Sequence, residues 1–268
     1  MAIVTLTTDF GQDDPYVAVM KGVMLSINPD IAIVDICHTI KPQNIAQAAY
    51  ILSTTSRYFP QGTIHVAVVD PGVGTKRRAV LLVTPKAYFV GPDNGVLSYV
   101  VEEAMPEVEA IALTNPRFWL SPLSNTFHGR DIFAPVAAHL SLGTPPREFG
   151  DLIPSLNTVA IPRPLLGEDG VLIGHVIHID WFGNLITDVR QADLPKGRLF
   201  VEVGGHIIED LSSSYEEGEE LLAIIGSENR LEVSVKQGSA AGFLRASVGD
   251  EVKVGVNRSS IRGSLGYQ

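Results

Sequence analysis

Strand-like apolar runs alternate with helix-like segments through the first half of the chain, and this alternation limits the fold more than any other feature. Helices are expected at 16–28, 44–59, 97–103 and 131–142, where apolar residues recur at helical spacing. Buried strands are expected between them at 3–7, 31–36, 63–69, and the hairpin-like pair 79–84 and 87–90. Strands that alternate with helices pair mostly in parallel. The first half therefore predicts an N-terminal α/β domain with a largely parallel sheet.

The pattern changes near Ile161. The segment 161–164 reads Ile-Pro-Arg-Pro and is followed by a Gly-Glu-Asp-Gly turn, which is linker and turn chemistry. Helical periodicity is scarce beyond it, and short apolar runs occur at 171–179, 199–203, 221–225, 231–235 and 251–254. We expect two domains, an α/β domain at 1–160 and an all-β domain at 161–268 that forms a small barrel or sandwich.

Composition narrows the class of protein. The chain is 45% hydrophobic and 19% charged, as globular proteins are, and its net charge of −10 argues against a general nucleic-acid binder. The single cysteine, Cys37, excludes an intrachain disulfide and any CxxC metal or redox pair. The N-terminus lacks the features of a signal peptide, and no apolar run reaches the ~20 residues of a membrane span. We expect a soluble cytoplasmic protein.

Two acidic residues follow predicted strands of the first domain, where ligands of open α/β sheets bind. Asp9 could accept both hydroxyls of a ribose, or it could cap the next helix. Asp70 opens a Gly/Pro turn that leads to Arg77 and Arg78. Glycines let a ligand approach the backbone, and an adjacent arginine favours an ionised carboxylate. A tight turn with a surface ion pair is the alternative interpretation of this segment.

His128 lies in a polar segment immediately before a predicted helix, a common place for a working histidine, and Asp131 is expected to cap that helix. The other histidines lack metal-ligand spacing and are expected in the core or at strand edges: His38, His65, His139, His175, His178 and His206. A metal-dependent phosphohydrolase would have to use Asp9, Asp13, Asp14 and Asp70. No histidine-rich set accompanies these aspartates, so we expect neither a metal nor a cofactor.

The densest polar cluster of the second domain is at 178–184, where Asp180 and Asn184 flank Trp181 and Phe182. Such a cluster suits a planar base that stacks on a ring while polar groups bind its edge or a charged tail. The alternative is a β-bulge whose aromatic residues belong to the core. The acidic run at 215–220 is expected to be a solvated loop. Turns of small residues are expected at 226–229 and 236–241.

Six short segments, taken in order, resemble one family. They are TTDFG at 7–11, VVDPGVGTKRR at 68–78, PDNG at 92–95, TFHGRD at 126–131, IDWFGNLITD at 179–188, and GS at 226–227 with QGSAA at 237–241. Together they resemble the S-adenosyl-L-methionine hydroxide adenosyltransferases, which share a superfamily with the fluorinases and chlorinases. Each motif is weak alone, but six in one order are specific and span almost the whole chain.

The resemblance implies an α/β domain joined to a β-barrel, and a homotrimer that holds the nucleoside between domains of neighbouring subunits. It places the catalytic residues of the family on Asp70, Arg77 and His128, with the adjacent Arg78 as the other candidate arginine. It places ribose binding on Asp9, and methionine binding on Asp180, Asn184, Ser227 and Glu228. It places adenine binding on Phe182 and on the backbone of a turn that includes Gly238 and Ala240. The residues of this turn that bind adenine could each be one position away.

The implied activity is hydrolysis of S-adenosyl-L-methionine to adenosine and L-methionine by an activated water that attacks C5′. The substrate and products are then the expected partners, without nucleic acid or membrane. Halogenating relatives carry a non-ionisable residue at the position of Asp70 and a long insertion before the PDNG segment, and this chain has neither feature. A non-catalytic S-adenosylmethionine-binding protein would not require Asp70, Arg77 and His128 together. We therefore expect a hydrolase.

Overall fold

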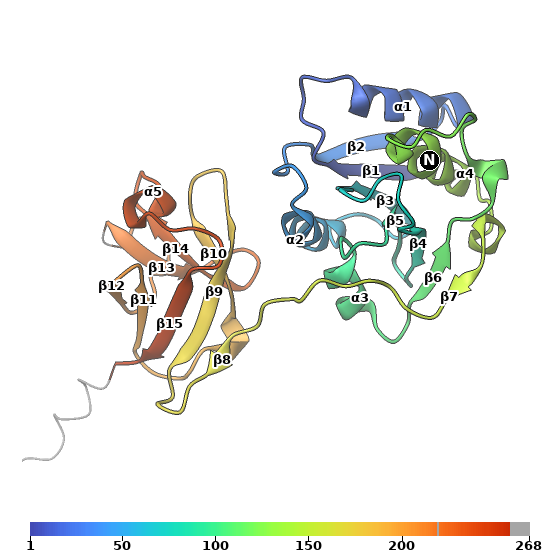
Figure 1. Cartoon of the computed structure of the whole chain (residues 1–268). Coiled ribbons are helices and arrows are strands. Elements are labelled where there is room, and N and C mark those ends of the chain that lie inside the picture. The colour runs from blue at the N-terminus through green and yellow to red at the C-terminus, as the bar shows by residue number, and fades with distance from the viewer. Residues whose placement is uncertain (219, 258–268) are drawn as a thin grey trace, which may run out of the picture. The chain divides into compact units, whose positions relative to one another are not determined.

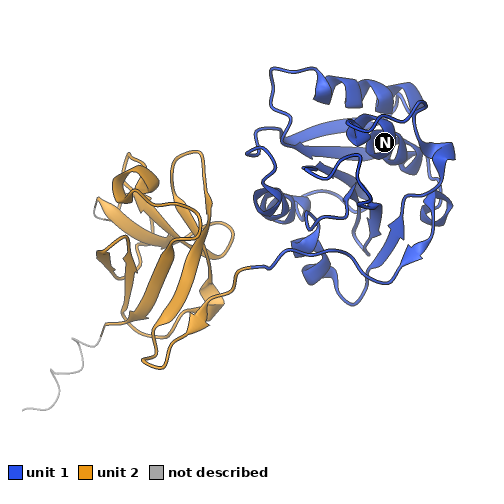
Figure 2. Ribbon diagram, viewed as in Figure 1, with its two compact units in different colours: residues 1–161 blue, residues 162–268 orange. Residues whose placement is uncertain are grey.

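The computed structural model describes residues 1–218 and 220–257, and the chain divides into two compact units, Met1–Ile161 and Pro162–Gln268 (Figure 2). The expected fold class, an α/β unit followed by a barrel-like all-β unit, is confirmed. Glu219, within the expected acidic loop, and residues 258–268 of the expected second domain lie outside the described residues. Throughout the described ranges, every helix is too short or too polar to cross a bilayer.

The first unit is built on a single mixed sheet (Figure 1). Its strands are β1 (Ile3–Thr8), β2 (Ala32–Cys37), β3 (Thr63–Val68), β4 (Ala79–Val83), β5 (Ala87–Pro92), β6 (Glu109–Ala112) and β7 (Leu152–Ile153). They lie in the order β2-β1-β3-β5-β4-β6-β7. The first four of that order pair in parallel, and β4, β6 and β7 pair in antiparallel fashion. The mixture arises because β4 and β5 form the hairpin that the sequence predicts.

Helices cover both faces of this sheet. One core cluster packs α1 (Tyr16–Ile27) and α4 (Ala134–Ser141) against one face, and a second packs α2 (Ile45–Ser56) and α3 (Ser98–Ala104) against the other. Fully buried apolar residues lie four positions apart, about one helical turn, in both α1 (Met20 and Met24) and α2 (Ala48 and Leu52). The sheet is thus buried on both sides, as parallel strands require.

Strand direction brings several chain segments to one edge of this sheet. The parallel pairs Thr8–Val68 and Val66–Val90 place the carboxyl ends of β1, β3 and β5 side by side. β4 runs the other way and begins at the same edge, because Ala79 pairs with Pro92. Ligands of open α/β sheets bind at this kind of edge.

The second unit is an antiparallel sheet that curls around its own core. Its strands are β8 (Leu165–Leu166), β9 (Leu172–Ile179), β10 (Leu185–Arg190), β11 (Leu199–Val203), β12 (His206–Glu209), β13 (Leu221–Ile225), β14 (Arg230–Val235) and β15 (Glu251–Val256). The order is β12-β11-β15-β9-β10-β14-β13, with β8 beside β9, and the end strands β12 and β13 contact each other. Alternate residues of these strands fill the interior, so the unit resembles a nearly closed barrel.

The helix expected at 131–142 is divided in two. A π-helical turn, Gly129–Phe133, precedes α4, and Asp131 lies inside that turn. The expectation that Asp131 caps the helix is therefore wrong. Its buried carboxylate instead accepts a hydrogen bond from the backbone N–H of Ser124 at 2.8 Å and pairs with Arg130, which holds the loop before the turn in place.

His65 gives the first unit a pH-dependent stability. Its ring is fully buried in β3, stacks on Phe89 and shares a hydrogen bond with Thr5 at 2.8 Å, and burial lowers its pKa from 6.5 to about 4. The unfolded chain therefore binds more protons than the folded chain between these values. We expect the contribution of His65 to be present above pH 6.5 and to be lost as the pH falls to 4, by about 3 kcal/mol.

Urea unfolding at pH 7 and at pH 4.5 measures this loss. His65→Phe should reduce the difference between the two free energies of unfolding, whereas the exposed control His206→Gln should leave it as in the wild type. An equal pH dependence in wild type and His65→Phe would contradict the expectation.

Candidate active site

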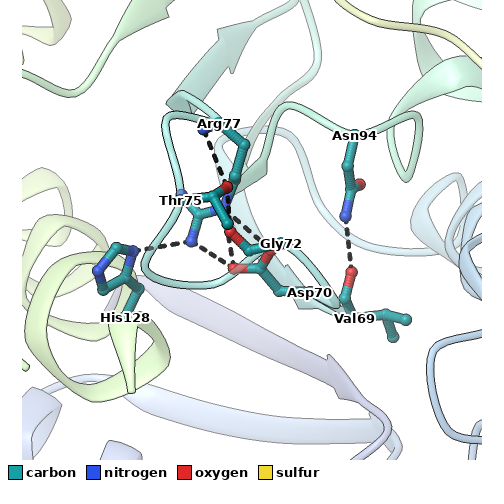
Figure 3. A network of polar contacts seen from close by, with 7 residues as sticks. All are labelled: Val69, Asp70, Gly72, Thr75, Arg77, Asn94 and His128. Atoms are coloured by element: carbon teal, nitrogen blue, oxygen red, sulfur yellow. Dashed lines mark hydrogen bonds and ion pairs between the residues drawn. The ribbon is translucent and has the colours of Figure 1, made fainter. Parts of the chain in front are cut away.

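Asp70 and Arg77 form an ion pair across the turn that joins β3 to β4 (Figure 3). The Arg77 Nε lies 2.9 Å from each Asp70 carboxylate oxygen, and one Nη also donates to Oδ2. The two side chains are only 5% and 9% exposed. A buried pair with several hydrogen bonds holds both groups in one geometry, and removing either partner leaves a buried charge uncompensated.

Arg77 also binds His128, which lies at the N-terminal end of the π-helical turn, more than fifty residues further along the chain. The same Nη is 2.8 Å from His128 Nδ1. A guanidinium can only donate, so Nδ1 accepts and the neutral ring carries its proton on Nε2. Burial, and then the positive charge of Arg77, lower the pKa of His128 below its usual 6.5. The histidine is therefore neutral at pH 7.

Two contacts explain why the loops of Arg77 and His128 meet. The Arg77 guanidinium lies 5.3 Å from the ring centroid of Phe133, which the π-helical turn after His128 supplies. Gly74, with φ +75°, packs so closely on Asn125 that a Cβ would stand 2.2 Å from the Asn125 carbonyl oxygen. Glycine at this position therefore allows the turn after Asp70 to contact the loop before His128.

Arg78, the alternative arginine, points to a different partner. Its Nε donates to Asp93 at 2.8 Å, and an Nη donates to the carbonyl of Ser155 at 3.0 Å. Arg77, in contrast, contacts both Asp70 and His128. The geometry thus groups Arg77, and not Arg78, with the two other predicted catalytic side chains.

Asp9 leaves the sheet at the same edge as Asp70, because β1 and β3 are parallel neighbours. Its Oδ2 accepts a hydrogen bond from the backbone N–H of Gln43 at 2.7 Å. α1 begins only at Tyr16, and Pro15 precedes it without a side-chain cap. The alternative in which Asp9 caps the helix is therefore wrong, and its carboxylate remains a candidate for binding ribose.

In the second unit, the predicted cluster at 180–184 is the loop between β9 and β10. The Asp180 carboxylate accepts hydrogen bonds from the backbone N–H of Phe182 and from the backbone and side chain of Asn184, at 2.8–2.9 Å. Trp181 is 95% exposed and Phe182 is 74% exposed. The alternative in which these aromatic residues belong to the core is wrong. Exposed rings of this size mark a contact surface.

A pocket of about 670 Å³ opens beside this loop. The predicted residues that line it are Asp180, Phe182, Asn184 and Gly238. Gly183 brings the predicted adenine turn to the loop, since a Cβ there would meet Ser239 at 2.0 Å, and its carbonyl accepts from Ala241 N–H. The other predicted residues lie outside the lining: Ser227 and Glu228 in the turn between β13 and β14, and Ala240 buried at the start of α5 (Ala240–Leu244).

Tyr215 is a pocket residue that the sequence does not single out, because it begins an acidic run that reads as a solvated loop. It lines the same pocket, and its hydroxyl donates to the buried Glu232 carboxylate at 3.2 Å. Burial, with the charges of Asp180 and Glu228 nearby, raises the pKa of Glu232. The only sequence feature that could have indicated Tyr215 as a pocket residue is an aromatic side chain directly before a run of acidic ones.

The predicted aspartates do not form a metal centre within residues 1–218 and 220–257, where no three His, Cys, Asp or Glu side chains are grouped to hold an ion.

Known proteins match the two parts of the chain that carry these residues. The SAM hydroxide adenosyltransferase N-terminal domain matches residues 4–150, and the corresponding C-terminal domain matches residues 174–253. The chain belongs to the SAM hydroxide adenosyltransferase family. Asp70, Arg77 and His128 lie in the first matched region, and the pocket around Asp180 lies in the second.

Individual members and relatives of the SAM hydroxide adenosyltransferases cover most of the chain. The (R)-S-adenosyl-L-methionine hydrolase of Thermus thermophilus is 41% identical over 266 residues, which are 95% of this chain and 100% of that protein. A fluorinase of Nocardia brasiliensis is 32% identical over 220 residues, 72% of this chain and 73% of the fluorinase. The crystal structure of an uncharacterized conserved protein from Thermotoga maritima has a TM-score of 0.86 at 36% identity and covers 94% of this chain and 99% of that one.

Proposed function

We propose that this protein hydrolyses S-adenosyl-L-methionine to adenosine and L-methionine. The observation that carries the proposal is the buried Asp70–Arg77–His128 network at the carboxyl edge of the parallel strands. A member of the SAM hydroxide adenosyltransferase family that only bound its ligand would not need a paired carboxylate and a neutral imidazole in contact with one guanidinium.

The substrate has a stereocentre at its sulfonium sulfur, and the hydrolase relative from Thermus thermophilus is named for the (R) form. With 41% identity over nearly the whole chain, we propose that this protein takes the same epimer. The net charge of −10 favours a substrate that carries positive sulfonium and ammonium groups.

The chemistry requires activation of the nucleophile and not of the leaving group. A water oxygen forms a bond to C5′ while the C5′–S bond breaks, and the bonding electrons return to sulfur, which leaves as a neutral thioether. Water has a pKa of about 15.7, so its proton must be accepted as the bond forms. General-base catalysis of this kind typically contributes about 10²–10⁴-fold.

The geometry divides this task between two groups. His128 Nδ1 is engaged by Arg77, so the neutral ring offers an N–H at Nε2 that can orient the water. The Asp70 carboxylate then accepts the proton. Arg77 keeps it ionised until the proton arrives, and offsets the negative charge that the oxygen gains as that proton leaves. Asp9 holds the ribose hydroxyls so that C5′ stays in line with the attacking oxygen.

The pocket of the second unit supplies the remaining recognition. Phe182 and Tyr215 present rings to a planar base, and Gly238 and the backbone near Ala240 read its edge. Asp180, Asn184, Ser227 and Glu228 serve the methionine end. The catalytic residues and Asp9 lie in one compact unit, and the residues for adenine and methionine lie in the other. We propose a homotrimer in which neighbouring subunits each supply one unit to a shared site.

Incubation with each sulfonium epimer of S-adenosyl-L-methionine in oxygen-18 water tests the function. We expect adenosine with the label in its 5′-hydroxyl, formed from the (R) epimer. Substrate that persists intact for hours would instead indicate a binding protein. A parallel incubation with added chloride distinguishes a halogenase, because the Asp70 carboxylate presents an acidic group where an attacking halide would have to sit. Chloro-deoxyadenosine formed as fast as adenosine would overturn the hydrolase assignment.

A further inference from the structure

The turn that follows β5, at residues 93–95, holds the backbone on one side of the Asp70–Arg77 pair. Asn94 Nδ2 donates to the carbonyl of Val69 at 2.9 Å (Figure 3). Its Oδ1 accepts from Val96 N–H at 3.2 Å. Val69 is the residue directly before Asp70. A side chain that fixes the Val69 carbonyl also fixes the peptide plane from which Asp70 projects.

The same turn holds the residue on the other side of the pair. Asp93 is buried, its carboxylate accepts from Arg78 Nε at 2.8 Å, and its backbone N–H donates to the Arg78 carbonyl at 2.9 Å. Arg78 directly follows Arg77. The two ends of the 70–77 turn are thus anchored to adjacent residues of one short segment.

This segment is also tied to the stretch that leads out of the first unit. Asp93 accepts from the backbone N–H of Asn157 at 2.7 Å, and Asn157 Nδ2 donates to the Asp93 carbonyl at 2.9 Å. Gly95 has φ +102°, and a Cβ there would lie 2.5 Å from a Val159 side-chain carbon. The first unit ends only two residues later, at Ile161.

We propose that Asp93 and Asn94 are positioning residues that align Asp70 with Arg77, an inference that rests on the proposed hydrolysis. They act through Val69 and Arg78 and touch no reacting atom. Proton transfer and in-line attack depend on fixed geometry, and a displacement of about 1 Å can lower the rate about 100-fold. The link to Asn157 makes the same alignment depend on the segment that connects the two units.

The test compares Asn94→Ala with a matched control, Asn115→Ala, in the full-length protein. Asn115 makes the same two kinds of bond, from Nδ2 to the Glu148 carbonyl at 2.8 Å and from Arg117 N–H to Oδ1 at 3.1 Å, and it is also half-buried. Asn94→Ala should lower kcat about 10- to 100-fold and change KM less than about 3-fold. Asn115→Ala should leave both values near those of the wild type.

Nuclear magnetic resonance of labelled histidine gives a second readout that does not need activity. When Asn94→Ala lets Asp70 move away, the negative charge that raises the pKa of His128 against burial and Arg77 is lost, so that pKa should fall further below 6.5. It should not move in Asn115→Ala. A change in kcat without a change in His128 titration, or no change in either, would overturn the positioning role.

Asn157→Ala keeps the test decisive if Asn94→Ala does not fold, because Asn157 is exposed and its loss spares the Arg78–Asp93 pair. A smaller fall in kcat, with KM preserved, is expected from the lost bonds to Asp93, and an unchanged kcat would contradict the proposal. If the wild type releases no adenosine, the proposed function fails, and the His128 titration of Asn94→Ala still decides the positioning inference.

Discussion

Replacing Asp70 with asparagine is expected to lower kcat by at least about 100-fold and to leave KM within a few fold, and His128→Ala is expected to do the same. Asparagine keeps the shape of the side chain but cannot take a proton from water. The measurement is adenosine release at saturating S-adenosyl-L-methionine. The matched control is Glu109→Gln, which breaks an exposed pair with Arg147 and should retain full activity. Near-normal turnover in both Asp70→Asn and His128→Ala would refute the catalytic roles of these two residues.

The pH profile separates the two roles. Burial and Arg77 lower the pKa of His128, so the working neutral form is present at neutral pH and is lost as the pH falls through that lowered pKa, below 6.5. Protonation places an N–H at Nδ1 against the Arg77 donor and breaks the network. The acid limb of kcat should therefore disappear in His128→Ala, whose residual rate no longer depends on that ring.

Mixing two inactive variants is expected to restore activity, and this is the second large effect. Asp70→Ala damages the first unit and Asn184→Ala damages the second. If neighbouring subunits each supply one unit to a site, random reassembly at equal amounts gives about a quarter of the sites two intact halves. Adenosine release should rise from near zero toward about a quarter of the wild-type value after dissociation and reassembly, or after co-expression.

The matched control mixes Asp70→Ala with His128→Ala. Both changes lie in the first unit, so no subunit supplies an intact first unit to any site and the mixture should stay inactive. Recovery in this control would mean that the assay detects something other than shared sites. A fully active monomer would refute the shared site and leave the hydrolase assignment untouched.

The sequence predicted the first unit well where elements are long and periodic. The helices near 16–28 and 44–59 and the strands near 3–7 and 63–69 occur within a few residues of their expected ends. It missed β6 and β7 of the first unit and β8, β10 and β12 of the second, of which β8 has only two residues. β6, β7 and β12 are short, and β10 mixes apolar residues with Thr187 and Asp188, which are buried by tertiary contacts that no local pattern reveals. Its inward-facing polar residues hide the hairpin with β9.

The predicted catalytic residues came from motif order, and their arrangement came only from the fold. Neighbouring residues in a turn, such as Arg77 and Arg78, have the same local sequence signal, and only the positions of Asp70 and Asp93 distinguish them. The PDNG segment counted only toward the family resemblance, because its partners at Val69, Arg78 and Asn157 are far away in sequence. Long-range hydrogen bonds leave no periodicity to detect.

The close packing of Gly74 on Asn125 has a practical consequence for anyone who redesigns this enzyme. The contact between Arg77 and His128 depends on the absence of a Cβ at position 74, since a Cβ there would collide with the backbone carbonyl of Asn125. A mutational library that varies this loop could abolish turnover with every acid, base and guanidinium still in place. The inactivity of such variants would be taken as evidence against the catalytic roles of these side chains, although only the packing of the two loops had changed.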